Sequence, residues 1–173
     1  MLLFSNKDST FDNKLYNKIL LLSRNKFFYK EAELPDTYQM RIRLIFFHIS
    51  FIINIIQSKD KSDNTKKIMQ RVFDSIFKKI EQDMREEGSG DVTINKNMKL
   101  LVNLFYNILI NFKNFDKLDE ENKINLFIKY VHLPNDVKKP KLIELVKYFE
   151  KYRTFCFDLS LNSVIKGDFN FKY

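Results

Sequence analysis

The sequence has little of the chemistry from which most catalytic and metal sites are built. It contains two histidines, His48 and His132, and one cysteine, Cys156. No zinc-ligand spacing and no Ser-His-Asp or Cys-His set is present. One histidine is enough to ligate haem, but a lone core histidine is the commoner case. We therefore expect a non-enzyme without metal or other cofactor. A single cysteine also excludes an internal disulfide and favours a reducing compartment.

Glycine and proline are equally scarce, at three residues each, so few positions interrupt a helix. Long apolar runs are missing too. The most apolar stretch, Leu44–Ile56, contains His48, Ser50 and Asn54 and is shorter than the roughly 20 residues that cross a bilayer. It is predicted to be a buried helix. The segment 1–10 lacks the features of a signal or transit peptide, so we expect no presequence.

Apolar residues recur at helical spacing along the chain, and 45% of all residues are hydrophobic. This predicts an all-α single compact domain, 1–173, of about six helices with a short irregular C-terminal tail. The helices are expected over 11–24, 38–57, 65–87, 95–112, 119–132 and from about Pro140 to Tyr152, with the tail over 159–173. Asp36 or Thr37 caps the second helix and Asp119 begins the fifth, which Pro134 ends.

The second predicted helix breaks the usual separation of polar and apolar faces. One polar stripe consists of Arg43, Ser50, Asn54 and Gln57. Arg41 and His48 lie on the opposite side, in line with apolar residues. An arginine that faces a core requires a partner, so we expect Arg41 to be buried against Asp74, Glu86 or Asp91. Two interpretations stay open: a structural ion pair with a core histidine, or a polar pocket that grips a partner segment.

The third predicted helix carries its charges in the reverse of the favourable order. Lys66, Lys67 and Arg71 stand near its start, and Glu81, Asp83, Glu86 and Glu87 near its end. Both placements oppose the helix dipole, and Arg41, Lys96 and Lys99 are candidates to offset them. A stripe with two predicted pairs, Asp74–Lys78 and Glu81–Arg85, is either a solvated face or an interaction surface.

The turn 87–91 contains two of the three glycines. It lacks the pattern of a phosphate-binding P-loop. We expect Gly88 or Gly90 to have positive φ, and the Asp91 side chain to bind backbone amides in the turn.

The formal net charge of +8 and the pI near 9.4 allow two interpretations. A basic protein binds phosphate-bearing partners such as nucleic acid, a ribosome or an anionic membrane surface. Alternatively, the lysines, which are spread over the whole chain, reflect drift toward A/T-rich codons.

Several of these segments, in order, resemble the ubiquinol–cytochrome c chaperones. The opening pattern is Leu15-Tyr16, Ser23-Arg24, Phe28-Tyr29, Leu34-Pro35-Asp36-Thr37, Arg41 and His48; the middle is Phe73-Asp74, Phe77, Arg85-Glu86 and Gly88-Ser89-Gly90-Asp91, followed by Lys96, Met98-Lys99 and Phe105-Tyr106. The resemblance is strongest over 15–112, and beyond it only Tyr130-Val131, Gly167 and Phe171 are similar. Met40, Arg43 and Asn107-Ile108 depart from the family pattern.

The resemblance implies a non-catalytic assembly chaperone that binds newly made cytochrome b during assembly of ubiquinol–cytochrome c reductase. It implies work at the cytoplasmic side of the inner membrane, or in the mitochondrial matrix of a eukaryote, peripheral to the membrane, with a ribosome or a small helical protein as further partners. Candidate binding residues are Arg41, His48, Asp74, Arg85, Glu86, Asp91, Lys96, Lys99 and Tyr106. We expect an apolar groove between the second and fourth helices, with the charged stripe at its edge. The alternative function is a basic helical module that binds RNA or the ribosome.

Overall fold

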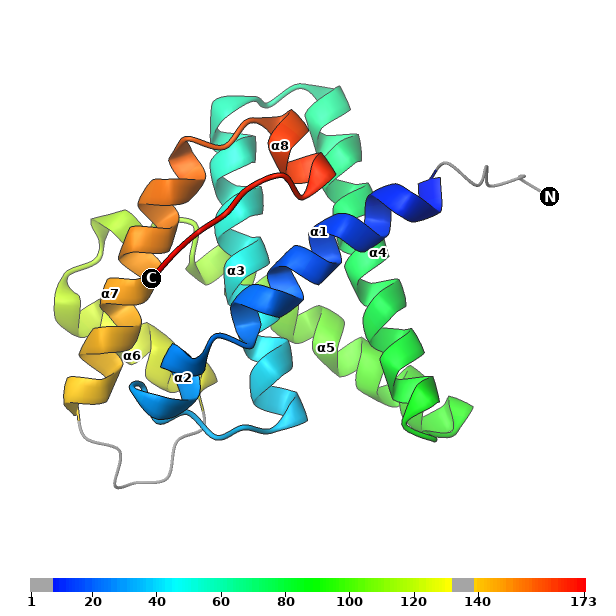
Figure 1. Ribbon diagram of the computed structural model, residues 1–173, viewed down its shortest axis with the longest axis horizontal. Helices are drawn as coiled ribbons and strands as arrows, with labels where there is room; N and C mark the ends of the chain where they lie inside the picture. The colour runs from blue at the N-terminus through cyan, green and yellow to red at the C-terminus, as the bar shows by residue number, and fades with distance from the viewer. Residues whose placement is uncertain (1–7, 132–138) are drawn as a thin grey trace.

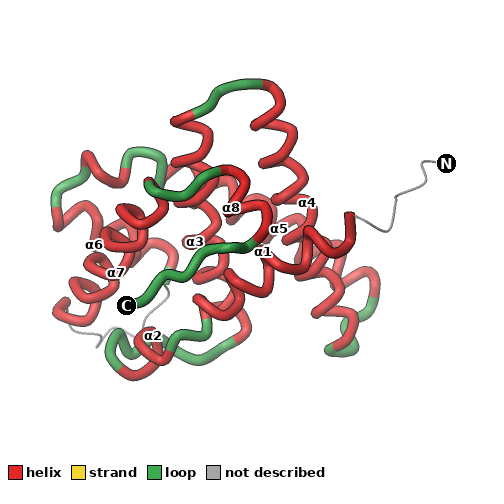
Figure 2. The backbone as a smooth tube through the Cα atoms, turned by 45° about the horizontal axis from the view of Figure 1, so that its top comes forward, coloured by secondary structure: helices red, strands yellow, loops and turns green. Residues whose placement is uncertain are grey.

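The computed structural model describes residues 8–131 and 139–173, and within these ranges the chain is helical with no strand (Figures 1 and 2). The predicted all-α fold is confirmed. His132 and Pro134, which were expected to end the fifth helix, lie outside the described residues. The elements are α1 (Asp8–Ser23), α2 (Lys26–Lys30), α3 (Tyr38–Lys59), α4 (Asp63–Glu86), α5 (Asp91–Asn111), the 3-10 helix η1 (Phe115–Lys117), α6 (Glu120–Tyr130), α7 (Lys139–Phe157) and α8 (Leu161–Lys166).

Helix α3 is the core of the molecule, and it packs against α1, α4, α5 and α7 (Figure 1). Fourteen of its residues are buried. The predicted cap is confirmed, since the Thr37 side chain accepts a hydrogen bond from the Met40 amide at 3.2 Å. By length and composition α3 is the one helix in the described ranges that could cross a membrane, but 78% of its most apolar window is buried inside the fold. It is therefore a core helix of this domain, as expected.

Aromatic rings hold α3, α6 and α7 together. The Phe149 ring of α7 stacks on Phe51 of α3 at 5.6 Å and on Phe127 of α6 at 5.2 Å, measured between ring centroids. Phe47 meets Phe149 edge to face at 5.6 Å. Offset and edge-on ring pairs add stability beyond the area they bury. Much of the sequence's phenylalanine thus lies in this core, where its side chains are excluded from solvent.

Helices α4 and α5 form a hairpin, and its turn has the positive φ that was predicted for Gly88 or Gly90. Gly88 has φ +87°. Its amide donates to Arg85 O at 3.0 Å, and the Ser89 amide donates to Met84 O at 3.1 Å. This pair of bonds is the Schellman motif, which requires a left-handed residue at Gly88. Because Gly90 then caps the next helix, α5 begins at Asp91 and not after Asn95 as predicted.

The C-terminal segment is more ordered than its sequence pattern indicates. The expected irregular tail contains α8, which packs on α1. The Ser160 and Ser163 side chains form a reciprocal capping box at its start, and Gly167 ends it with φ +59°. Six residues are too few to show a helical period, which explains why this helix was missed. Phe171 then packs edge to face on Tyr148 at 5.4 Å.

Candidate functional site

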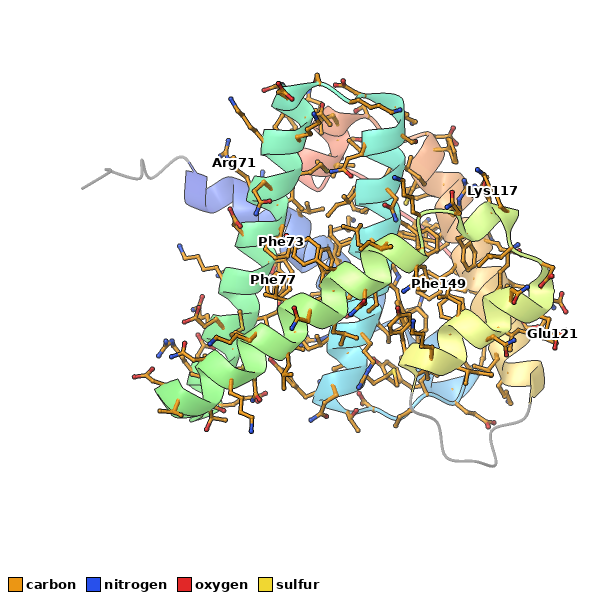
Figure 3. The ribbon with its side chains drawn as sticks, turned by 180° about the vertical axis from the view of Figure 1, so that it is seen from behind. Arg71, Phe73, Phe77, Lys117, Glu121 and Phe149 are labelled. Carbon is orange, nitrogen blue, oxygen red and sulfur yellow. The ribbon has the colours of Figure 1, made fainter. Side chains whose placement is uncertain are left out.

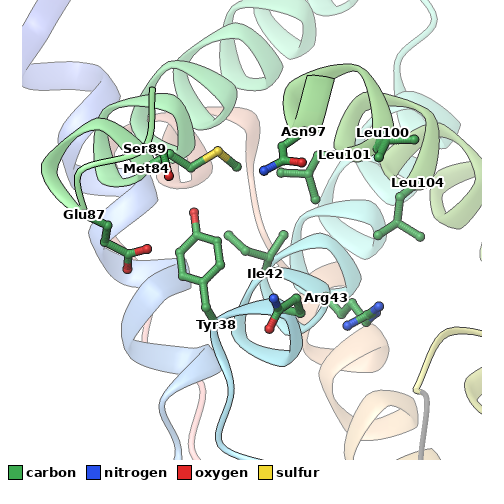
Figure 4. Close-up of a pocket in the computed structure, with 11 residues that line it drawn as sticks. Tyr38, Ile42, Arg43, Met84, Glu87, Ser89, Asn97, Leu100, Leu101 and Leu104 are labelled. Atoms are coloured by element: carbon green, nitrogen blue, oxygen red, sulfur yellow. The ribbon is translucent and has the colours of Figure 1, made fainter. Parts of the chain in front are cut away.

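An open cavity of about 330 Å³ lies between the first two turns of α3 and the middle of α5, and the end of α4 closes one side of it (Figure 4). It is lined by Tyr38, Gln39, Ile42, Arg43, Met84, Glu87, Ser89, Asn97, Leu100, Leu101 and Leu104. Its walls are mainly apolar. We call it the α3–α5 groove, and it lies between the two helices where the sequence placed an apolar groove.

Helix α5 continues the groove as an exposed apolar face. Along its length only Ile94, Phe105 and Ile108 are buried. Large apolar side chains are instead open to solvent: Val92 is 85% exposed, Leu100 59%, Tyr106 43% and Ile110 69%. Figure 3 shows α5 lying across the back of the molecule, on the side away from α1. We call this surface, from Val92 to Ile110, the α5 outer face.

The α5 outer face is basic as well as apolar. Lys96 and Lys99 are exposed on it, and no acidic residue occurs between Val92 and Phe115. The Tyr106 ring lies 5.4 Å from the Phe73 ring of α4, which anchors this part of the face to the hairpin. Three of the candidate binding residues, Lys96, Lys99 and Tyr106, thus lie on one surface, and their role in binding stays a prediction.

Two polar groups in the groove have no partner. Among the described residues, Arg43 Nε and the Tyr38 hydroxyl are buried atoms without a hydrogen bond. Burial lowers the pKa of Arg43 from its ordinary value. Burial, followed by the nearby Asp83 and Glu87 carboxylates, raises the pKa of Tyr38 to about 12. Both groups therefore remain hydrogen-bond donors at neutral pH.

A second cavity, of about 320 Å³, lies on the other side of Tyr38 and Ile42. Its lining includes Arg24, Arg41, Asp83 and Glu86. This places Arg41 and Glu86 near one another, but it does not place Arg41 where the sequence predicted.

The prediction that Arg41 is buried against a carboxylate of α4 or its turn is wrong. The guanidinium pairs with Asp36 at 2.7 Å, and 40% of the Arg41 side chain is exposed. The hydrogen bond to Asp36 raises the pKa of Arg41. Asp36 stands just before the N-cap of α3, within reach of the next turn, so a local partner replaces the distant one.

The separation of faces on α3 was wrong for the polar stripe, which lies against α5, and right for His48, which faces the core. The Asn54 amide donates to Leu109 O at 2.9 Å, and Ser50 is fully buried. His48 is fully buried as well: Nδ1 is 2.6 Å from Leu44 O and Nε2 is 2.9 Å from the Tyr148 hydroxyl. His48 is thus a core residue in this structure and lines neither cavity.

The remaining predicted residues lie along the exposed edge of the α4–α5 hairpin. The Glu81–Arg85 pair is confirmed at 2.8 Å. Asp74 accepts a hydrogen bond from Gln70 at 2.9 Å. Asp91 was expected to bind backbone amides, but its carboxylate pairs with Arg85, and no side chain caps the start of α5. Arg85 reaches Asp91 across the Schellman turn, which explains the difference.

Among the described residues, the charges of α4 whose partners are known are not paired with Arg41, Lys96 or Lys99, the residues that were predicted to offset them. Lys66 pairs with Asp63 at 2.9 Å in the first turn. The Tyr16 hydroxyl of α1 donates to Asp83 at 2.9 Å.

The candidate residues chosen from the sequence did not include Tyr38 and Leu100 of the groove or Ile110 of the α5 outer face. Arg43 was assigned to the polar stripe without a role. One signal was available, because α5 has more apolar residues than one buried stripe can hold. Met98, Leu101, Val102 and Leu109 are accordingly only partly buried.

These features define an all-helical domain with an open apolar groove, and the residues described contain no cluster of acidic, His or Cys side chains able to hold a metal ion. Residues 30–171 match the family described as ubiquinol–cytochrome C chaperone. The chain belongs to this family. The crystal structure of the Cbp3 homolog from Brucella abortus has the same fold, with a TM-score of 0.78 and 23% sequence identity over 96% of this chain and 91% of that one. Among curated proteins, no relative matches the sequence.

Proposed function

We propose that this protein is a non-catalytic assembly chaperone that binds newly made cytochrome b and assists assembly of ubiquinol–cytochrome c reductase. Membership of the chaperone family supports the role. The observation that carries the proposal for the site is the unburied apolar face of α5 beside the α3–α5 groove. Helix α5 has 21 residues, of which only three are buried. It therefore leaves apolar surface that a client helix can cover.

A membrane-protein client fits this surface better than a soluble one. Before assembly, cytochrome b exposes long apolar helices that need a temporary apolar partner. Leu100 and the half-buried Leu104, one turn apart, and Ile110 offer such contacts, as amphipathic groove-and-helix interfaces do. Lys96 and Lys99 beside them suit a position peripheral to an anionic membrane surface. The location at the inner membrane is part of the same proposal.

The alternative function, binding of RNA or the ribosome, would use a different surface that is rich in lysine. A cavity of about 600 Å³ at the α3–α4 turn has Lys61, Lys66 and Lys113 in its lining. Asp60 lines it too, and Lys66 is already paired with Asp63, which reduces its positive field. Phosphate contacts weaken steeply with salt and apolar contacts do not, so salt dependence separates the two functions.

The test is capture of cytochrome b from solubilised membranes by tagged protein, with an unrelated helical membrane protein quantified in the same eluate. We expect cytochrome b to be enriched and the enrichment to survive moderate salt. Ile110→Asp should reduce capture by about tenfold or more, because it places a charge in an apolar contact. No enrichment over the unrelated protein would refute the proposal.

The chain offers a closely matched control. Leu21 of α1 is 67% exposed and Ile110 is 69% exposed, and the two helices lie on opposite sides of α3 (Figures 1 and 3). Leu21→Asp should therefore leave capture unchanged. Equal losses in both variants would indicate a general effect of surface charge and would contradict an α5 site.

A further inference from the structure

The α3–α5 groove contains a positive charge that the protein does not neutralise. Within the described part of the chain, no ion pair or hydrogen bond satisfies Arg43, and its Nε atom is sealed from solvent without an acceptor. Arg43 is only partly buried, so the end of its guanidinium stays open to the groove, but a buried N–H without an acceptor destabilises the fold. A stable fold keeps such a group where function supplies the acceptor, or where water reaches it.

The surroundings of Arg43 specify what kind of acceptor is missing. Leu101 and Leu104 wall the groove beside it, and Ile42 separates it from Tyr38 (Figure 4). Glu87 is the one acidic residue of the lining and stands at the opposite end of the groove from Arg43 (Figure 4). We therefore expect the acceptor to belong to a bound segment whose other side chains are apolar.

The charge of the adjoining surface points to an anionic group. From Val92 to Phe115 the charged residues are Lys96, Lys99 and Lys113, with no carboxylate among them. A guanidinium presents parallel N–H donors that match a carboxylate.

We propose that the α3–α5 groove selects an apolar helical segment of the client that carries one acidic residue, and that Arg43 binds that carboxylate. This deepens the proposed function and rests on it, because it names the chemistry of the segment bound at the same site. An apolar helix with one carboxylate is costly to leave exposed and costly to insert in a membrane. The groove offers it both an apolar wall and a counter-charge until its permanent partner is in place.

The test uses two fluorescent helical peptides of Leu and Ala with identical polar ends, one with a single central Glu and its twin with Gln. Fluorescence anisotropy gives the Kd of each for the wild type, for Arg43→Met and for Lys99→Met. We expect the wild type to prefer the Glu peptide by roughly tenfold or more, the strength of a charged hydrogen bond. Arg43→Met should abolish the preference, and Lys99→Met should retain it.

Thermal unfolding of Arg43→Met provides a second measurement. Because Met keeps the apolar stem and removes an unsatisfied donor, its Tm should equal or exceed that of the wild type. A lower Tm together with loss of all peptide binding would make Arg43 architectural and overturn the proposal.

The remaining outcomes separate this inference from the proposed function. Equal binding of both peptides by the wild type would leave an apolar client site but refute selection by Arg43. No binding of either peptide would contradict the client surface itself. Binding to phosphatidylglycerol vesicles that Arg43→Met removes, without a Glu preference among peptides, would assign Arg43 to lipid and also refute the proposal.

Discussion

Nε2 of His48 lies 2.9 Å from the hydroxyl of Tyr148, which is 100 residues further along the chain. Nδ1 is 2.6 Å from the Leu44 carbonyl oxygen. A carbonyl only accepts, so Nδ1 carries the proton and Nε2 accepts from the tyrosine. Both ring nitrogens are satisfied with the imidazole neutral, and the pair links α3 to α7 in the core.

This link predicts a loss of stability at acidic pH. Burial lowers the pKa of His48 from 6.5 to about 4. Between these values the unfolded chain binds a proton that the folded chain does not, so stability falls as pH decreases from 6.5 to 4. The total loss is roughly 3 kcal/mol. Urea unfolding across this window measures it.

The control for that prediction is His48→Gln, which cannot titrate. Both proteins are compared with His132→Gln present, so that His48 is the only histidine that differs. The variant should show a shallower pH dependence than its parent between pH 6.5 and 4. Identical slopes would mean that His48 does not titrate in this way.

Replacing each of the three glycines by alanine should destabilise the protein to a different degree. At Gly167, a Cβ would lie 2.9 Å from backbone atoms of Lys14, and φ is +59°. Gly167→Ala should cost roughly 2–4 kcal/mol, from strain plus a forced shift of α8 against α1. Gly88→Ala has the strain but open space, so we expect about 1 kcal/mol.

Gly90, with φ −74° and nothing near its Cβ position, is the matched control. Gly90→Ala should change the unfolding free energy least of the three. Chemical denaturation of all three variants gives the order, and any other ranking would contradict the described turn geometries.

Cys156 is predicted to be inert in the folded protein. It is 1% exposed, and burial raises the pKa of its thiol to about 12. The reactive thiolate is therefore both scarce and inaccessible. A chromogenic disulfide reagent should react only after unfolding in guanidinium. Rapid stoichiometric reaction in native buffer would contradict this placement.

Arg85 and Glu86 test the edge of the proposed site. Arg85 pairs with Glu81 and Asp91 on the exposed hairpin, and Glu86 accepts a hydrogen bond from Gln82 at 2.8 Å. Exposed pairs contribute little to stability. The double replacement by Ala should leave thermal unfolding, followed by circular dichroism, nearly unchanged and should weaken capture of cytochrome b. Unfolding of the variant would make both residues architectural, and normal capture would place the client elsewhere.

The sequence predicted those features that depend on neighbouring residues. The caps Thr37 and Asp119 and the left-handed Gly88 follow from local backbone chemistry, and all three are confirmed. The prediction for Arg41 was wrong because Asp36, five residues away, was a nearer partner than any carboxylate of α4. Helical periodicity could not predict the orientation of α3 either. This helix packs against α1, α4, α5 and α7, so it has no single face toward the core.

The candidate site was predictable in outline only. The excess of apolar residues on α5 indicates an unburied face, and three of the candidate binding residues, Lys96, Lys99 and Tyr106, lie on it. Whether Arg43 finds an acceptor depends on how α3, α4 and α5 pack around it. The spacing of residues in the sequence therefore does not reveal that the acceptor is missing.

The most direct test of the account is site-specific photocrosslinking in cells that assemble the respiratory complex. A photoreactive residue is placed at Leu100 or Ile110 on the α5 face, and at Leu21 on α1 as the equally exposed control. We predict cytochrome b adducts from both α5 positions and none from Leu21. Adducts from Leu21 alone, or none containing cytochrome b from either α5 position, would contradict the assignment of α5 as the client-binding surface.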